Sequence, residues 1–227
     1  MNKLEQILIK HQSEFAKVVD ISFRKEDIYE LNLSIDNEEL RVIENLNTEN
    51  LTNYIDCKLK QSGASIAIGG YAEDRLIYRK SKHFGADENA RTFHLGLDIW
   101  CSENSSVFAP IDSVVHSFKD NDLFGDYGPT IILEHKLDNM TFYTLYGHLT
   151  RESLNDINPG KLISKGEKFA EIGNDRENGN WPPHLHFQVI TDMQGKKGDF
   201  PGVSSRKELD AYMEICPDPS LIINVTD

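Results

Sequence analysis

The sequence predicts a mainly β protein, built as an antiparallel β-sandwich or a partly open barrel, with a small α/β extension at the N-terminus. From residue 66 onward, short apolar and β-branched runs alternate with glycine, proline and aspartate, which is typical of many short strands joined by turns. Residues 1–63 instead show helical spacing. Ser62-Gly63-Ala64-Ser65 has the small residues of a junction. We therefore predict an extension at residues 1–63 and a β domain at residues 64–227.

The extension is expected to contain two helices and one strand. Near-helical spacing predicts a short amphipathic helix from Leu4, Ile7, Leu8, His11, Phe15 and Val18. Residues 29–35 alternate as a small strand does. Residues 50–61 follow a start rich in threonine and asparagine, which predicts a second helix.

The β domain is expected to hold short strands separated by turn residues. We place these strands at residues 66–68, 76–78, 97–100, 107–109, 114–118, 130–135, 140–147, 168–172 and 185–190. Residues 69–75 contain two neighbouring glycines but lack the spacing of a phosphate-binding loop, so we interpret them as a strand bend. Within this bend, Glu73 and Arg75 are candidates to line a cleft and contact substrate. Residues 198–203 and 216–219 predict loops and a short helix.

Three short motifs bring together five groups that can bind a metal or transfer a proton. They are His94-Leu95-Gly96-Leu97-Asp98, Tyr146-Gly147-His148-Leu149 and His184-Leu185-His186. Residues two apart in a strand point to the same face, so His184 and His186 can both face one cleft. His94 and Asp98 are four apart, and they can converge on one ion from a helical turn or from a curved strand end.

These ligand types indicate a hydrolytic zinc site. With one more histidine, His94 and Asp98 make three protein ligands, and zinc held by three ligands keeps its fourth position for water. Zinc is preferred because the site is rich in nitrogen, although the same ligands tolerate manganese or cobalt. Alone, His148 could be a strand-end histidine bonded to the backbone, and Asp98 an ordinary turn residue. The combination and order of the motifs favour the catalytic interpretation.

The order of these motifs resembles that of the lysostaphin-type zinc metallopeptidases, peptidase family M23, which have the duplicated hybrid motif. The resemblance runs from about residue 66 to about residue 190. It also includes Val107-Phe108-Ala109-Pro110, Tyr127-Gly128, the run 131–135, the glycines 160, 166 and 173, and Pro183 to Phe187. It implies an antiparallel β fold of the kind predicted above.

Position by position, the resemblance implies that His94, Asp98 and His186 bind Zn²⁺. It implies that His148 and His184 flank the metal-bound water as catalytic groups, where an imidazole can take a proton and later deliver it to a leaving amine. The expected activity is therefore that of a metalloendopeptidase-like hydrolase, which cleaves a peptide or amide bond by direct attack of that water.

Two departures from the family pattern affect the expected substrate contacts. Members often have a tyrosine a few residues before the first metal histidine, thought to support the oxyanion, and residues 79–93 contain none. A donor is still needed, so Arg91 or Tyr146 is our hypothesised substitute. Residues 174–183 replace a shorter Gly/Ser/Thr-rich turn and carry Trp181, which either stacks on a ligand or packs beneath the double proline.

Composition and charge limit the function classes. The chain has 227 residues, 39% of them hydrophobic and 27% charged, which suits one good domain with an extension. Neither a signal peptide nor an apolar run long enough to span a membrane is visible. The three cysteines are widely spaced and are expected to stay reduced. We therefore expect a cytoplasmic protein that does not bind membranes.

The negative net charge of the chain argues against nucleic acid and anionic cell-wall polymers as partners. With a net charge of −13, the chain has neither the basic stripe nor the motifs of a nucleic-acid-binding protein. The same charge would be repelled by anionic cell-wall polymers. Simple solubility also explains the acidity. A peptide or amide substrate is thus the expected partner, and the oligomeric state is left open.

Two alternatives to an intracellular hydrolase remain at this stage. The first is a catalytically idle zinc-binding or ligand-binding module of a larger assembly, suggested by the missing tyrosine. The second is a hydrolase of peptidoglycan cross-links that is exported by an unrecognised route. Retention of all five motif residues favours the enzyme.

Overall fold

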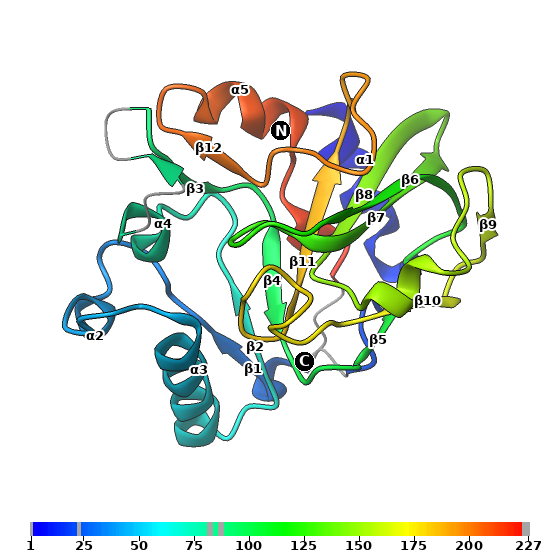
Figure 1. The fold of residues 1–227 in the computed structure, drawn as a ribbon. Coiled ribbons are helices and arrows are strands. Elements are labelled where there is room, and N and C mark those ends of the chain that lie inside the picture. Colours follow the sequence, from blue (N-terminus) through cyan, green and yellow to red (C-terminus); the bar gives the residue numbers. More distant parts are fainter. Residues whose placement is uncertain (1, 22–23, 81–83, 86–88, 224–227) are drawn as a thin grey trace.

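The structure, a computed structural model, describes residues 2–21, 24–80, 84–85 and 89–223. Within them, an open, eight-stranded sheet forms the centre of the fold (Figure 1). All neighbouring strands in it are antiparallel except β1 and β2. In sheet order the strands are β1 (Ile28–Glu30), β2 (Ile66–Gly69), β4 (Leu97–Trp100), β11 (His184–Ile190), β8 (Met140–Gly147), β7 (Gly128–Leu137), β6 (Ser113–Asn121) and β9 (Leu162–Ile163). The prediction of a mainly β, antiparallel fold is confirmed.

Two small sheets and several helices flank the central sheet. The small sheets pair β5 (Ser106–Phe108) with β10 (Lys168–Glu171) and β3 (Arg91–His94) with β12 (Val203–Ser205). The α-helices are α1 (Lys3–His11), α2 (Glu38–Arg41), α3 (Thr48–Ser62), α4 (Leu76–Lys80) and α5 (Leu209–Ile215). The short 3-10 helices are η1 (Gln12–Glu14), η2 (Lys25–Asp27), η4 (Arg151–Leu154) and η5 (Pro219–Leu221).

The hairpin of β7 and β8 forms because its turn suits the twist of the strands. Asp138 and Asn139 connect the strands, and both adopt positive φ, at 46° and 61°. Consecutive positive φ values define the two-residue turns that match strand twist, and Asp and Asn tolerate them. The turn is also held by α1, because Lys10 Nζ lies 2.6 Å from Asp138 Oδ2.

Strand alternation divides the central sheet into two faces with different roles. On β11, Leu185, Phe187 and Val189 belong to the main hydrophobic core. The main core also takes Ile131, Leu133, Phe142 and Tyr146 from β7 and β8. Ile132, Leu145 and Ile190 alternate along the strands with these core residues. They belong to a second cluster, which also contains Phe200 and Leu209. His184 and His186 therefore share the second face, because side chains two apart lie on the same side of a strand.

Helices α1 and α3 of the N-terminal region pack into two different hydrophobic clusters. On α1, Leu4 and Leu8 are fully buried in the main core. On α3, Leu51 and Ile55 form a third cluster with Trp100 of β4. The predicted boundary between residues 63 and 64 stays a prediction, and the structure shows that the two regions share a sheet through β1 and β2. Residues 1, 22–23, 81–83, 86–88 and 224–227 of the two regions lie outside the described residues.

Several local predictions can be compared with these elements. The helix expected at residues 50–61 is α3, which is capped by Asn47 and ends at Gly63 with φ of +73°. The strand expected at residues 76–78 is wrong, because these residues form helix α4. Short apolar runs fit either structure by period alone. The strand expected at residues 29–35 is limited to Ile28–Glu30. None of the helices among the described residues has the length and apolar character needed to cross a membrane.

His135 on β7 gives the fold a predictable response to acid. It is buried, with its Nε2 2.6 Å from Thr144 Oγ1, and burial lowers its pKa from 6.5 to about 4, against the effect of the Asp112 carbonyl. The unfolded chain therefore binds a proton that the folded chain does not between about pH 6.5 and 4, so the free energy of unfolding falls as the pH falls through this window. One such proton changes it by about 1.4 kcal/mol per pH unit.

Urea unfolding from pH 4.5 to 7.5, with chelator present, tests this expectation on the wild type and on His135→Gln. The variant should lose stability less steeply toward acid, because it lacks this titrating group. Parallel curves for the two proteins would contradict it.

Candidate active site

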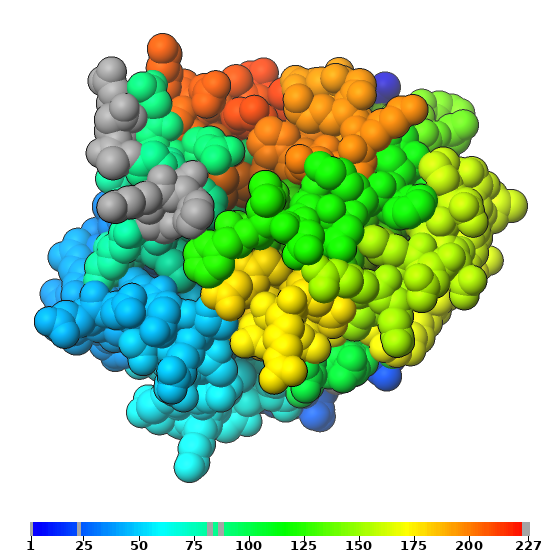
Figure 2. Space-filling model, viewed as in Figure 1, coloured from blue at the N-terminus to red at the C-terminus, as the bar shows by residue number. Residues whose placement is uncertain are grey.

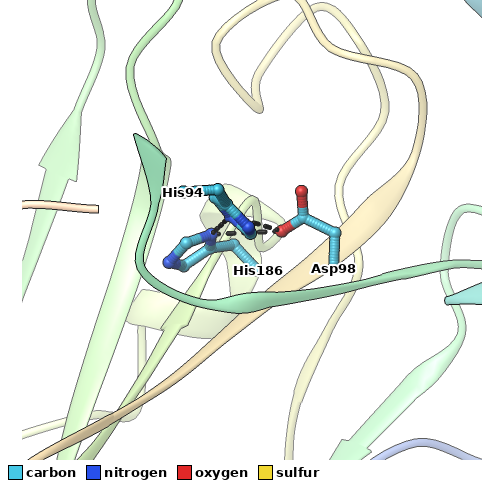
Figure 3. A group of neighbouring side chains, drawn as sticks. All are labelled: His94, Asp98 and His186. Carbon is cyan, nitrogen blue, oxygen red and sulfur yellow. Dashed lines mark hydrogen bonds and ion pairs between the residues drawn. The ribbon is translucent and has the colours of Figure 1, made fainter. Parts of the chain in front are cut away.

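The metal-ligand candidates meet where β3 ends beside β4 and β11. β3 ends at His94, and Leu95 and Gly96 turn the chain into β4, which carries Asp98. The register of β11 against β4 then places His186 opposite Asp98. All three side chains point toward one another (Figure 3). A local turn supplies two of the groups, and strand pairing supplies the third.

The three ligand atoms have the spacing of a metal site. His94 Nε2 lies 2.9 Å from His186 Nδ1 and 3.3 Å from Asp98 Oδ1. His186 Nδ1 lies 3.1 Å from the same Oδ1. Zinc bonds of roughly 2.0–2.1 Å in a tetrahedron separate neighbouring ligand atoms by about 3.3 Å. The triad therefore fits a tetrahedral ion closely, and all three residues are buried.

Hydrogen bonds on the outer side of each imidazole fix which nitrogen carries the proton. His94 Nδ1 lies 3.1 Å from the Gly70 carbonyl, which can only accept, so the proton is on Nδ1. His186 Nε2 lies 3.0 Å from Gln188 Oε1, and the Gln188 amide is oriented by donating to the Pro201 carbonyl at 3.1 Å. His186 thus donates through Nε2. The two nitrogens that face each other, His94 Nε2 and His186 Nδ1, both present lone pairs.

The charge of the triad suits a cation. Burial disfavours the ionised Asp98 carboxylate, but His94 and Arg75 outweigh burial and hold the pKa of Asp98 well below 3.8. Burial, followed by the nearby Arg75 guanidinium, lowers the pKa of His94 to about 3. At neutral pH the site therefore offers a cation the neutral imidazole of His94 and the carboxylate of Asp98.

His148 and His184 form a second pair beside the triad. Their ring centroids lie 4.2 Å apart. His148 Nδ1 lies 2.7 Å from the Asn178 carbonyl, and His184 Nδ1 lies 2.7 Å from the Pro182 carbonyl. Each ring therefore donates through Nδ1 and leaves Nε2 to accept a proton. Nε2 of His184 lies 3.8 Å from Asp98 Oδ2. Burial, followed by the neighbouring imidazoles, lowers the pKa of His148 well below 6.5, and burial also lowers the pKa of His184.

The backbone holds both rings in place. His148 follows β8 with φ of +62°, a conformation that costs energy for a residue other than glycine. Two hydrogen bonds hold it, from His148 N to the Tyr127 carbonyl at 2.7 Å and from Gly173 N to the His148 carbonyl at 2.8 Å. On the adjacent strand β11, the ring of His184 stacks on Trp100 at 5.5 Å. The two proton-transfer candidates are therefore fixed before any substrate binds.

All five residues line one cavity of about 890 Å³. Its walls come from regions far apart in the sequence, including Tyr78 of α4, Tyr127 and Trp181. Figure 2 shows the blue and cyan N-terminal region lying against the yellow loop that contains Trp181. Thr48 Oγ1 joins the two by donating to the Asn180 carbonyl at 2.6 Å.

The structure separates the predicted substrate contacts into two groups. Arg91 and Trp181 line the cavity, and their role stays a prediction. Trp181 packs edge-on near Tyr78 and His148, at 6.1 and 6.4 Å. The prediction that Tyr146 contacts substrate is wrong, because its side chain is fully buried in the main core, with its ring centroid 5.4 Å from that of Phe187. It lies two residues before His148 in sequence but on the other face of the sheet.

Arg75 lines the cavity, as predicted, whereas Glu73 is not among the residues that line it. Arg75 is only 3% exposed, and its guanidinium already donates to Asp98, Glu73, Tyr78 and Gly69. Few of its donors remain for a substrate. Its guanidinium is held by an internal contact with the metal-ligand candidate Asp98, and its contact with substrate stays a prediction.

Sequence reasoning missed two cavity tyrosines and one glutamine. Tyr78 lies one residue before the range searched for a tyrosine, and α4 brings its ring to 6.5 Å from that of His94. Tyr127 lies beside His186, with ring centroids 4.9 Å apart, and donates to the Phe200 carbonyl at 3.1 Å. Burial raises the pKa of Tyr78 to about 12, so its phenol stays protonated at neutral pH. Gln188 could have been found, because it shares the strand face of His184 and His186.

One family of known proteins is similar to the region of the chain that contains this site. The model of peptidase family M23 matches residues 92–199, a range that contains all five histidine and aspartate positions described above. No curated protein matches the chain.

Similar solved structures include three bacterial peptidases. A peptidase M23 of Pseudomonas aeruginosa is 19% identical over 59% of this chain and 45% of its own, with a TM-score of 0.39. A zinc-containing peptidase of Vibrio cholerae is 25% identical over 54% of this chain and 32% of its own, with a TM-score of 0.38. The catalytic domain of the antimicrobial peptidase lysostaphin from Staphylococcus simulans is 19% identical over 53% of this chain and 80% of its own, with a TM-score of 0.38. The chain spans less than half the length of the first two.

These overall similarities are low. Over residues 92–199, which contain the motif residues that the fold brings together, the chain matches the model of peptidase family M23.

Proposed function

We propose that the protein is a zinc-dependent hydrolase that cleaves a peptide or amide bond. The observation that carries this proposal is the geometry of the triad and of its outer hydrogen bonds. His94 Nε2, His186 Nδ1 and Asp98 Oδ1 lie within 3.3 Å of one another, and outer hydrogen bonds take the imidazole protons to the far side of both rings. Three converging lone pairs without a shared proton repel each other unless a cation lies between them.

His94, Asp98 and His186 would hold the zinc ion, with Gly70 and Gln188 fixing the two rings from behind. When bound, such an ion activates a water and polarises the scissile carbonyl. Three protein ligands leave a position open for these partners, as in catalytic rather than structural sites. The donor set and its spacing thus fit the ion that the family implies.

His148 and His184 would move the proton of the reaction. A free Nε2 on either ring accepts a proton from the attacking water as its O–H bond breaks and its oxygen bonds to the carbonyl carbon. The same nitrogen then gives the proton to the amine nitrogen as the C–N bond breaks. Their lowered pKa values keep both rings neutral, and so able to accept, at neutral pH.

The substrate and the cellular location belong to the same proposal. A peptide or amide substrate fits a cavity of about 890 Å³ that several loops line. Cytoplasmic location stays a prediction, and cell fractionation tests it. Activity on isolated peptidoglycan, together with protein outside the cell, would favour wall hydrolysis instead.

Metal content and hydrolysis measured on the same purified protein test this function. The assay compares the wild type with His186→Ala, and with His116→Ala as a control that removes a half-buried histidine of β6 outside the cavity. A peptide library with glycine-rich and D-amino-acid members supplies the substrates. We expect one zinc ion per chain in the wild type and the control, little in His186→Ala, and cleavage that stops with chelator and returns with zinc.

Two other results would overturn the proposal. Bound zinc with no cleavage of any peptide would favour a binding module in a larger assembly. Cleavage that resists complete metal removal would place the chemistry elsewhere.

A further inference from the structure

Arg75 lies directly behind the metal-ligand candidate Asp98, although it precedes the matched family region. Its Nη1 lies 2.5 Å from Asp98 Oδ2. Both side chains are almost completely buried, at 3% and 2% exposure. A buried ion pair of this kind costs desolvation, so it is stabilising only where its geometry is well fixed.

The guanidinium of Arg75 is fixed on several sides. Its Nε donates to Glu73 Oε2 at 3.0 Å, and Nη1 also donates to the Tyr78 hydroxyl at 3.2 Å. Nη2 donates to the Gly69 carbonyl at 3.3 Å. The planar fork therefore has one orientation, in which Nη1 meets Asp98.

This contact divides the two oxygens of the Asp98 carboxylate. Oδ2 is taken by Arg75, whereas Oδ1 faces His94 and His186 at 3.3 and 3.1 Å. A carboxylate without a partner at Oδ2 can rotate about its last bond. With Arg75 in place, Oδ1 stays at the position that completes the triad.

The hydrogen bonds of Arg75 and Glu73 also connect the site to the N-terminal region. Glu73 holds Arg75 through Oε2, and its Oε1 accepts a hydrogen bond from Leu33 N at 2.8 Å. Leu33 belongs to the third cluster with Leu51 of α3, and Leu76 N at the start of α4 donates to the Leu33 carbonyl at 3.0 Å. Figure 1 shows α3 and α4 on the same side of the molecule as β1 and β2.

We propose that Arg75, held by Glu73, is a positioning residue that orients Asp98 for metal binding. Residues 31–80 thereby complete a metal site whose ligands all lie within residues 92–199, the region that matches the family model. This inference rests on the proposed metal site. It assigns a role to a segment outside residues 92–199.

Two physical effects of Arg75 on a bound cation have opposite signs. Its positive charge repels the ion, so removing it would tighten binding. Its contact with Oδ2 orients the ligand, so removing it would weaken binding. Glu73, 3.0 Å away, offsets most of the charge, and we therefore expect orientation to dominate. Loss of such an outer partner typically weakens metal affinity about 10–100-fold.

Zinc dissociation constants, measured by competition with a chromogenic chelator, test this inference without an activity assay. We expect Arg75→Met to bind zinc about 10–100-fold more weakly than the wild type. Arg75→Lys should retain more affinity than Arg75→Met, because it keeps a cation near Oδ2. The absorption spectrum of the Co²⁺-loaded protein should change in Arg75→Met, since the carboxylate no longer has one orientation.

Arg79→Met is the matched control. Arg79 lies on α4, which begins directly after Arg75, and it pairs with Asp74 at 2.6 Å, but its side chain is half exposed, so its loss should leave zinc affinity and the Co²⁺ spectrum unchanged. Glu73→Gln provides a second variant should Arg75→Met fail to fold. It keeps an acceptor for Leu33 N but loosens Arg75, and we expect a smaller weakening of zinc binding, by several-fold.

The outcomes separate this inference from the proposed function. If the wild type binds zinc and folded Arg75→Met binds it as tightly or more tightly, the positioning role is overturned and the metal site stands. The same holds for an unchanged dissociation constant in Glu73→Gln. If the wild type binds no zinc at all, the proposed function fails, and this inference fails with it.

Discussion

Replacing His184 by asparagine is expected to lower the rate of peptide cleavage by roughly 10²–10⁴-fold while leaving the zinc content unchanged. The asparagine amide nitrogen lies near the position of Nδ1, so it can still donate to the Pro182 carbonyl, which His184 meets at 2.7 Å. The variant therefore removes Nε2 and the ring contacts with Trp100 and His148, and it keeps the hydrogen bond to Pro182. We therefore expect the variant to lose a general acid–base group and to keep all three metal-ligand candidates.

His148→Asn should give the same separation of turnover from metal content. Asparagine tolerates the positive φ of 62° at this position, and its amide can donate to the Asn178 carbonyl as His148 does. Because the two rings are in contact, the double variant should lose little more than the worse single variant. Turnover and zinc stoichiometry measured on the same samples decide the point. Loss of zinc in either single variant would make that histidine a ligand instead.

Replacing Gly96 by alanine is expected to weaken zinc binding by roughly 5- to 150-fold. A Cβ at this position would lie 2.5 Å from His186 Cε1, 2.7 Å from its Nε2 and 3.0 Å from the Phe187 carbonyl oxygen. Such contacts cannot persist, so the ring or the strand must move. Overpacking of this kind costs about 1–3 kcal/mol, which corresponds to that range if the displaced imidazole bears the cost.

Gly160→Asn serves as the matched control for Gly96→Ala. Gly160 lies at an exposed turn with φ of +90° and open space around its Cβ position, and asparagine tolerates positive φ. Zinc affinity by chelator competition should fall in Gly96→Ala and stay at the wild-type value in the control. Equal affinities in all three proteins would mean that His186 is not the ligand whose position Gly96 protects.

The sequence predicted the parts of the site that depend on short-range geometry. His184 and His186 share a strand face because strand side chains alternate with a period of two, and the same rule would have added Gln188. His94 and Asp98 converge across a turn of two residues. Such relations need no knowledge of the rest of the chain.

Nearness in sequence was a poor guide wherever the sheet separates neighbours. Tyr146 was a candidate donor because it lies two residues before His148. Yet β8 ends at Gly147, and the positive φ of His148 turns only that residue toward the cavity, while Tyr146 stays in the main core. Tyr78, which lies 16 residues before His94, does reach the cavity. Its position depends on α4, in a run whose apolar residues also fitted a strand.

The sequence by itself determined the antiparallel β class and predicted the five candidate site residues and the resemblance to peptidase family M23, because strand periodicity and motif spacing can be read from the chain alone. The tertiary structure alone decided which side chains surround them. The pairing of β4 with β11 brings Asp98 to His186, and the packing of residues 31–80 brings Arg75 to Asp98. Such long-range contacts follow from strand register and from the burial of whole elements, which no short window of sequence contains.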